Sequence, residues 1–88
     1  MRRAAKRDAN EPEIIRALLA VGATVARLND PHVPDLVVGF RGVNYLIEVK
    51  HGYGKLTPGQ TELHVSWRGQ CATAKTVEQA LQIIGAIE

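Results

Sequence analysis

Residues 33–50, VPDLVVGFRGVNYLIEVK, contain two apolar runs separated by the short segment Arg41-Gly42. β-Branched and aromatic residues dominate both runs, which predicts strands over 36–40 and 43–50 joined by a tight turn. Residues at equal distances from such a turn face each other, so Asp35 is expected opposite residues 48–49. The hairpin therefore predicts that Asp35, Glu48 and Lys50 meet at its open end.

Glu48 and Lys50 lie two residues apart on the second predicted strand, so their side chains project from the same face at a spacing of roughly 6 to 7 Å. Two carboxylates and an ammonium group in this arrangement can hold a hard divalent cation beside a phosphate and a water molecule. Each residue also has a purely structural explanation. Asp35 can be a turn residue after Pro34, Glu48 can pair with Lys50 or Arg41, and Lys50 can protect a strand edge.

The remaining elements follow from their boundary signals. A helix over 11–21 is predicted after Asn10 as N-cap and before Gly22, and 24–28 is a candidate strand. Thr57-Pro58-Gly59-Gln60 begins a second helix that Gly69 closes. A strand over 71–75 and a third helix from Thr76 follow, with apolar positions expected to be buried at Leu81, Ile83, Ile84 and Ile87. The order helix, strand, strand, strand, helix, strand, helix favours an α/β domain with a mixed sheet.

The combination of Pro34-Asp35, Glu48-Val49-Lys50, an acidic first helix and a second helix with Gln60 resembles the PD-(D/E)xK nucleases. Residues 33–70, VPDLVVGFRGVNYLIEVKHGYGKLTPGQTELHVSWRGQ, are similar to the compact stand-alone VRR-NUC domains encoded by viruses and bacteria. The resemblance implies a single-domain nuclease core of order αβββαβα, with a four-stranded mixed sheet flanked by helices. We assign this VRR-NUC-like domain to residues 9–88, preceded by a basic N-terminal arm at 1–8.

The resemblance also implies an acidic residue on the first helix at the site, and it points to Glu13 with Glu11 as the fallback. Asn10-x-x-Glu13 has the spacing of a capping box, which is a competing explanation for Glu13. Gln60 meets the same objection, because Thr57-x-x-Gln60 is a capping box, while the family places a supporting polar residue early in this helix.

The chemistry implied is hydrolysis of a DNA phosphodiester by a Mg²⁺-activated water, with Mn²⁺ able to substitute. Asp35, Glu48, the backbone carbonyl of Val49 and Glu13 would bind the metal, while Lys50 would orient the nucleophile and Gln60 a water or phosphate. Stand-alone domains of this family resemble endonucleases that act as homodimers on branched DNA such as four-way junctions. The small size of the chain, 88 residues, also favours association with a second copy. A non-cleaving nucleic-acid-binding module and a small structural or assembly protein are the alternatives.

The formal net charge is only +2, but four cations, Arg2, Arg3, Lys6 and Arg7, lie within the first seven residues. This arm is either a phosphate contact or a solvated terminus. The single cysteine excludes an intrachain disulfide and a cysteine-rich zinc site, and Cys71 is expected to be a buried structural thiol. No continuous apolar stretch predicts a secretion signal or a membrane span, so a cytoplasmic protein without membrane partner or small-molecule cofactor is expected. Further candidates are Tyr53, Lys55 and His64 as DNA contacts, and Trp67 as a core or dimer-interface aromatic.

Overall fold

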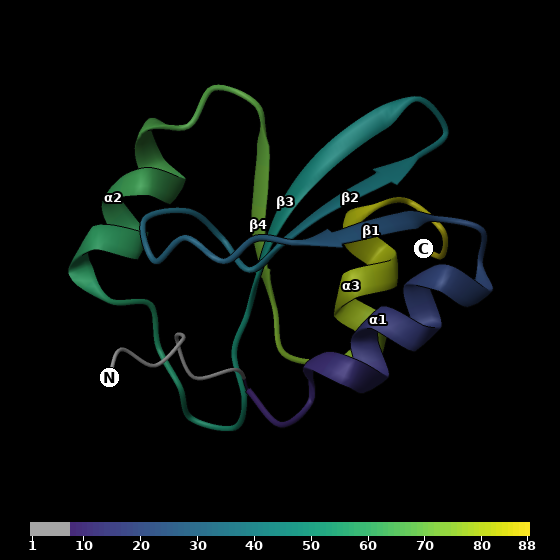
Figure 1. Cartoon of the computed structure of the whole chain (residues 1–88), viewed down its shortest axis with the longest axis horizontal. Helices are drawn as coiled ribbons and strands as arrows, with labels where there is room; N and C mark the ends of the chain where they lie inside the picture. The colour runs from purple at the N-terminus through teal and green to yellow at the C-terminus, as the bar shows by residue number, and fades with distance from the viewer. Residues whose placement is uncertain (1–7) are drawn as a thin grey trace.

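A computed structural model describes residues 8–88, so the predicted basic arm lies outside the described residues except for Asp8. The elements follow the predicted order and form a four-stranded mixed sheet flanked by helices (Figure 1), which confirms the fold class. They are α1 (Glu11–Ala20), β1 (Thr24–Arg27), β2 (Leu36–Phe40), β3 (Val43–Val49), α2 (Pro58–Ser66), β4 (Gln70–Ala74) and α3 (Val77–Ile83).

The strands lie in the order β1-β2-β3-β4, with the first two pairings antiparallel and the last parallel. The β2–β3 hairpin has the predicted register, because Leu36 pairs with Ile47 and Phe40 with Val43. Its turn residues Arg41 and Gly42 have φ angles of 52° and 81°. Positive φ at both central positions is the type I′ conformation, whose twist matches that of paired strands. This turn therefore fixes the register that brings Asp35 beside Glu48.

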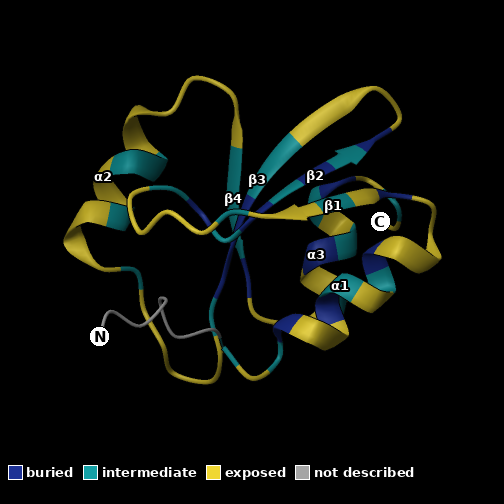
Figure 2. Ribbon diagram, viewed as in Figure 1, coloured by how far each residue is buried: buried dark blue, intermediate teal, exposed yellow. Residues whose placement is uncertain are grey.

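Helices α1 and α3 lie together on one side of the sheet, and α2 lies on the other side (Figure 1). The core fills the α1 and α3 side, and Figure 2 shows its buried segments along the central strands and on the inner surfaces of these two helices. Its buried apolar members are Ile14, Leu18, Ala23, Leu36, Val38, Phe40, Ile47, Val49, Ala74, Ala80 and Ile84. In contrast, α2 contains no buried residue, so the α2 side of the sheet is only partly covered.

Ile87 is 40% exposed and does not belong to the core, contrary to expectation. Trp67 is 46% exposed, which excludes the core alternative for this residue, and a place in a dimer interface stays a prediction. Ile87 follows the end of α3 by four residues, where the chain has left the helical surface that faces α1. Cys71 is half-buried and free, and burial, assisted by the charge of Glu48, raises the pKa of its thiol.

The start of α1 is held by contacts across the fold and not by a capping box. Asn10 makes no side-chain cap hydrogen bond, so the predicted box with Glu13 is absent. Instead, its Nδ2 donates to the carbonyl oxygens of Lys50 and Lys75, at 3.0 and 2.8 Å. These residues directly follow β3 and β4, so Asn10 fastens the first turn of α1 to the carboxyl ends of both strands.

Within residues 8–88, the helices are too short or too polar for any of them to cross a membrane.

The hairpin turn gives a stability prediction. We expect Gly42→Ala to lower the free energy of unfolding by about 1 kcal/mol, because a Cβ in the left-handed region is strained. Gly59→Ala is the matched control, since Gly59 lies in α2 with open space around the added Cβ and ordinary backbone angles. Urea denaturation measures both variants. An equal stability of Gly42→Ala and wild type would contradict the role of the turn.

Candidate active site

The ends of β2 and β3 bring two carboxyl groups together. Asp35 directly precedes β2, and the pairing of Leu36 with Ile47 places it next to Glu48. Asp35 Oδ2 accepts a hydrogen bond from the backbone N–H of Val49 at 2.8 Å, which fixes the side chain across the two strands. The predicted convergence of Asp35 and Glu48 is therefore present in the structure.

Glu48 is a buried carboxyl group, only 4% exposed. Burial raises its pKa to about 8, and a hydrogen bond with Asp35 and the charge of Asp35 act in the same direction. The nearby Lys50 ammonium opposes this rise, with its Nζ 4.0 Å from Glu48 Oε2. In the protein alone, Glu48 therefore keeps its proton at neutral pH, because burial disfavours the charged form and the neighbouring Asp35 adds to that cost.

The backbone of Val49 faces the same place. Lys50 N–H donates to the Ala74 carbonyl of the β4 side at 3.1 Å. Backbone groups of successive strand residues point alternately to the two neighbouring strands, so the N–H and carbonyl of Val49 point away from β4, toward β2. The Val49 N–H meets Asp35 there, and the carbonyl of Val49 lies on the same side.

Helix α2 supports Glu48 from the partly covered face of the sheet. Gln60 Nε2 donates to Glu48 Oε2 at 3.2 Å, while its Oε1 accepts from Thr57 N–H at 2.9 Å. Thr57 Oγ1 in turn accepts from Gln60 N–H, so the predicted capping box is present. The two explanations for Gln60 are thus compatible, since opposite ends of one amide serve the cap and the carboxyl group.

His64 extends this support. Its Nδ1 donates to the Gln60 carbonyl at 2.9 Å, and its Nε2 lies 3.2 Å from Thr73 Oγ1 on β4. Thr73 pairs with Glu48 across the parallel strands. Both ring nitrogens of His64 therefore have partners within the protein, and the side chain connects α2 to the sheet. Of the three predicted DNA contacts, Tyr53 and Lys55 are the exposed ones.

The two acids of α1 occupy different environments. Glu11 is 1% exposed, and its Oε1 lies 3.9 Å from Arg27 Nε at the end of β1. Glu13, the predicted site acid, is exposed, and neither of these two acids lines the cavities beside Glu48. Glu11 is buried one residue after Asn10, which contacts the Lys50 carbonyl. The family resemblance pointed to Glu13 and gave Glu11 as the fallback, and the burial of Glu11 depends on how α1 packs on the sheet, which no local motif contains.

A polar cavity of about 160 Å³ opens at the strand ends. Four carboxyl groups and one ammonium line it: Asp8, Asp30, Asp35, Glu48 and Lys50. Asp8 and Asp30 were missed by the motif analysis, and no signal in the sequence singles them out beyond their negative charge. Among residues 8–88 no group of three or more His, Cys, Asp or Glu side chains is arranged to bind a metal ion. The surplus of carboxyl groups with the Val49 carbonyl nevertheless suits a hard, oxygen-binding cation.

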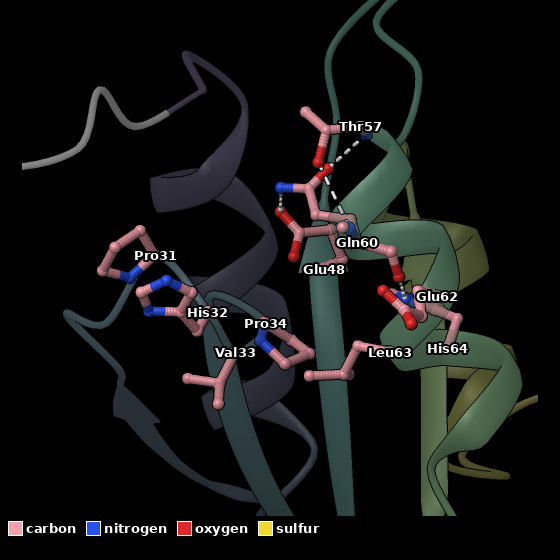
Figure 3. Close-up of a pocket in the computed structure, with 11 residues that line it drawn as sticks. Pro31, His32, Val33, Pro34, Glu48, Thr57, Gln60, Glu62, Leu63 and His64 are labelled. Carbon is pink, nitrogen blue, oxygen red and sulfur yellow. Dashed lines mark hydrogen bonds between the residues drawn. The ribbon is translucent and has the colours of Figure 1, made fainter.

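A second cavity, of about 220 Å³, lies between residues 31–34 and α2 and shares Glu48 and Gln60 with the first (Figure 3).

Comparison with known proteins gives a structural relationship. No protein-family model and no curated protein sequence matches the chain significantly. A solved structure described as "VRR_NUC domain" superposes with a TM-score of 0.69 and 24% sequence identity, covering 92% of this chain and all of the other. The chain has the VRR-NUC fold. The VRR-NUC resemblance carried by Pro34-Asp35 and Glu48-Val49-Lys50 thus agrees with the fold of nearly the whole chain.

The raised pKa of Glu48 predicts how stability depends on pH. Between the ordinary value of 4.5 and about 8, the folded protein retains a proton that the unfolded chain has lost, so the free energy of unfolding falls as pH rises through this range. We expect Glu48→Gln to remove this dependence on pH. At pH values above this range, the variant is expected to be more stable than wild type by on the order of 1 to 3 kcal/mol. Urea denaturation across this range, with a chelator present, measures the effect. Exposed Glu13→Gln is the control, and a slope shared by all three proteins would refute the assignment.

Proposed function

We propose that this protein is a metal-dependent DNA endonuclease that hydrolyses phosphodiester bonds. The observation that carries the proposal is the contact of the buried Glu48 carboxyl group with Asp35, beside the Lys50 ammonium. A buried carboxyl group whose ionisation is opposed by burial and by a neighbouring acid is costly as structure alone, and such groups are concentrated at functional sites. The VRR-NUC fold supports the same class of activity.

The charge of the polar cavity supports a metal. Even while Glu48 keeps its proton, the other three carboxyl groups outnumber the one ammonium and would repel a DNA phosphate, so an anionic substrate needs a cation to approach. Asp35, Glu48 and the carbonyl of Val49 would hold Mg²⁺, or Mn²⁺ in its place. When bound, the ion supplies Lewis-acid activation of the phosphate and of a water molecule.

The side chains around the metal ligands have separable roles. Gln60 fixes the Glu48 carboxyl group by a hydrogen bond from its amide, which pre-sets the ligand without adding charge. Lys50 places its ammonium at the same carboxyl group, where it can orient the nucleophile or stabilise charge developing on the phosphate oxygens. We propose Glu11 in preference to Glu13 as the acid of α1, because Glu11 is buried next to the Asn10 contact with β3.

Mutagenesis of the two acids tests the activity. We expect Asp35→Ala and Glu48→Ala each to lower cleavage of DNA in Mg²⁺ by at least about a hundredfold, and Gln60→Ala by about tenfold, because a positioning partner costs less than a ligand. Cleavage is measured on duplex, flap and four-way DNA, with Mg²⁺, with Mn²⁺ and with a chelator.

Glu11→Gln and Glu13→Gln form the matched pair for this experiment, since both lie in the first turn of α1. Only Glu11→Gln is expected to reduce cleavage. Full activity of Asp35→Ala or Glu48→Ala would refute the proposed site. If the wild-type protein binds DNA but cuts none with Mg²⁺ or Mn²⁺, the result would favour a non-cleaving binding module.

We further propose that the enzyme acts as a homodimer on branched DNA such as four-way junctions. The small size of the chain supports this, because a domain of this length has little surface for both catalysis and substrate selection. Light scattering is expected to give twice the mass of one chain, and a four-way junction is expected to be cut at least about tenfold faster than a duplex of the same arm sequence. A monomer that cuts both equally would contradict the proposal.

A further inference from the structure

The cavity between residues 31–34 and α2 has no role in the hydrolysis described above. We call this cavity the α2 slot. Figure 3 shows Pro31, His32, Val33 and Pro34 on one side, and the α2 residues Glu62, Leu63 and His64 on the other. Glu48 lies at one end of the slot, beside Gln60.

The walls of the α2 slot suit a flat, largely apolar ring. Val33, Pro34 and Leu63 form apolar surfaces on opposite sides, and Pro34 is buried, which makes that side rigid. At about 220 Å³ the slot is smaller than the roughly 300 to 1,000 Å³ of pockets for drug-sized ligands. It therefore has room for a single ring system and not for a whole nucleotide.

The rim carries polar groups suited to a heterocyclic base. The His32 ring is held by Asp30, whose Oδ1 accepts from the His32 backbone N–H at 2.8 Å and lies 3.2 Å from Nδ1. A fixed imidazole at the mouth of a cavity offers a stacking surface. Glu62, exposed on α2, adds a carboxylate that can accept from the amino groups of a base.

The position of the slot links it to the bond that is cut. It shares Glu48 and Gln60 with the polar cavity, so a strand whose phosphate lies at Asp35 and Glu48 carries its neighbouring base past the mouth of the slot. A base that is paired and stacked in a duplex cannot enter a cavity, whereas an unpaired one enters at little cost.

We propose that the α2 slot binds the unstacked nucleobase next to the scissile phosphate. This inference rests on the proposed nuclease function and adds a substrate class to it: DNA with an unpaired or easily unstacked nucleotide at the cut. Each protomer of the proposed dimer would then contribute to the selection of branched DNA through the base that it captures.

A cycle of substrate and enzyme changes tests the slot. The substrate change replaces the nucleotide next to the cut by an abasic site, and the enzyme change is Leu63→Trp, which fills the slot. Val65→Trp is the matched control, because Val65 lies on the same helix, is 82% exposed and does not line the slot. Wild type and Val65→Trp are expected to cut the intact strand at least about fivefold faster than the abasic one, given the usual strength of base stacking in proteins. Leu63→Trp is expected to cut both at the slower rate.

If wild type cuts the intact and the abasic strand equally fast, the proposal that the α2 slot binds a base is wrong, while the nuclease proposal stands. Equal slowing of both strands by Leu63→Trp would also overturn the slot proposal, because the effect would then be general. A second measurement needs no variant: 2-aminopurine at the same position, bound to wild type with Ca²⁺ in place of Mg²⁺, is expected to become more fluorescent as it unstacks, and unchanged fluorescence counts against the slot. A fluorescence rise without cutting of any DNA in Mg²⁺ or Mn²⁺ would refute the nuclease function and retain the slot.

Discussion

The register of the β2–β3 hairpin is the constraint on which the site depends. A shift by one residue would move Asp35 away from Glu48 and turn alternate side chains to the opposite face of the sheet. The turn at Arg41 and Gly42 prevents this shift, because both residues adopt the positive φ angles of a type I′ turn. The core reinforces the same register, since Leu36 and Ile47 are paired and fully buried on one face. The acidic pair at the open end is thus a consequence of packing elsewhere in the hairpin.

Much of this arrangement can be predicted from the sequence because it is encoded locally. The Arg41-Gly42 turn, the capping box at Thr57 and the apolar runs of β2 and β3 each act within a few residues. They are sufficient to predict the hairpin and the meeting of Asp35 with Glu48.

Contacts between distant segments could not be predicted in the same way. The Asn10 amide donates to the carbonyls that follow β3 and β4, and the side chain makes no cap hydrogen bond to its own helix. These contacts depend on where β3 and β4 end in space. The burial of Glu11 and the exposure of Glu13 follow from that docking, which local capping rules do not contain. The α2 slot was missed for a related reason, since its two sides come from residues 31–34 and from α2, and no motif in either segment indicates that the two face each other.

Helix α2 differs from the other helices in what holds it. It has no buried residue, and its attachment to the sheet includes the polar contacts of Gln60 with Glu48 and of His64 with Thr73. Elements with little apolar burial open at lower free energy than the core around them. The same helix forms one side of the α2 slot and holds one of the proposed ligands, so its movement would alter both together.

The two hydrogen bonds of Asn10 also bear on when the site can assemble. They span 40 and 65 residues along the chain, so neither can form until β3, and then β4, has left the ribosome. Pairings of such long range are slow to form because the intervening chain must first be ordered. A nascent chain can therefore build its hairpin early, yet it completes the surroundings of the acidic pair only when nearly all of the domain has been synthesised.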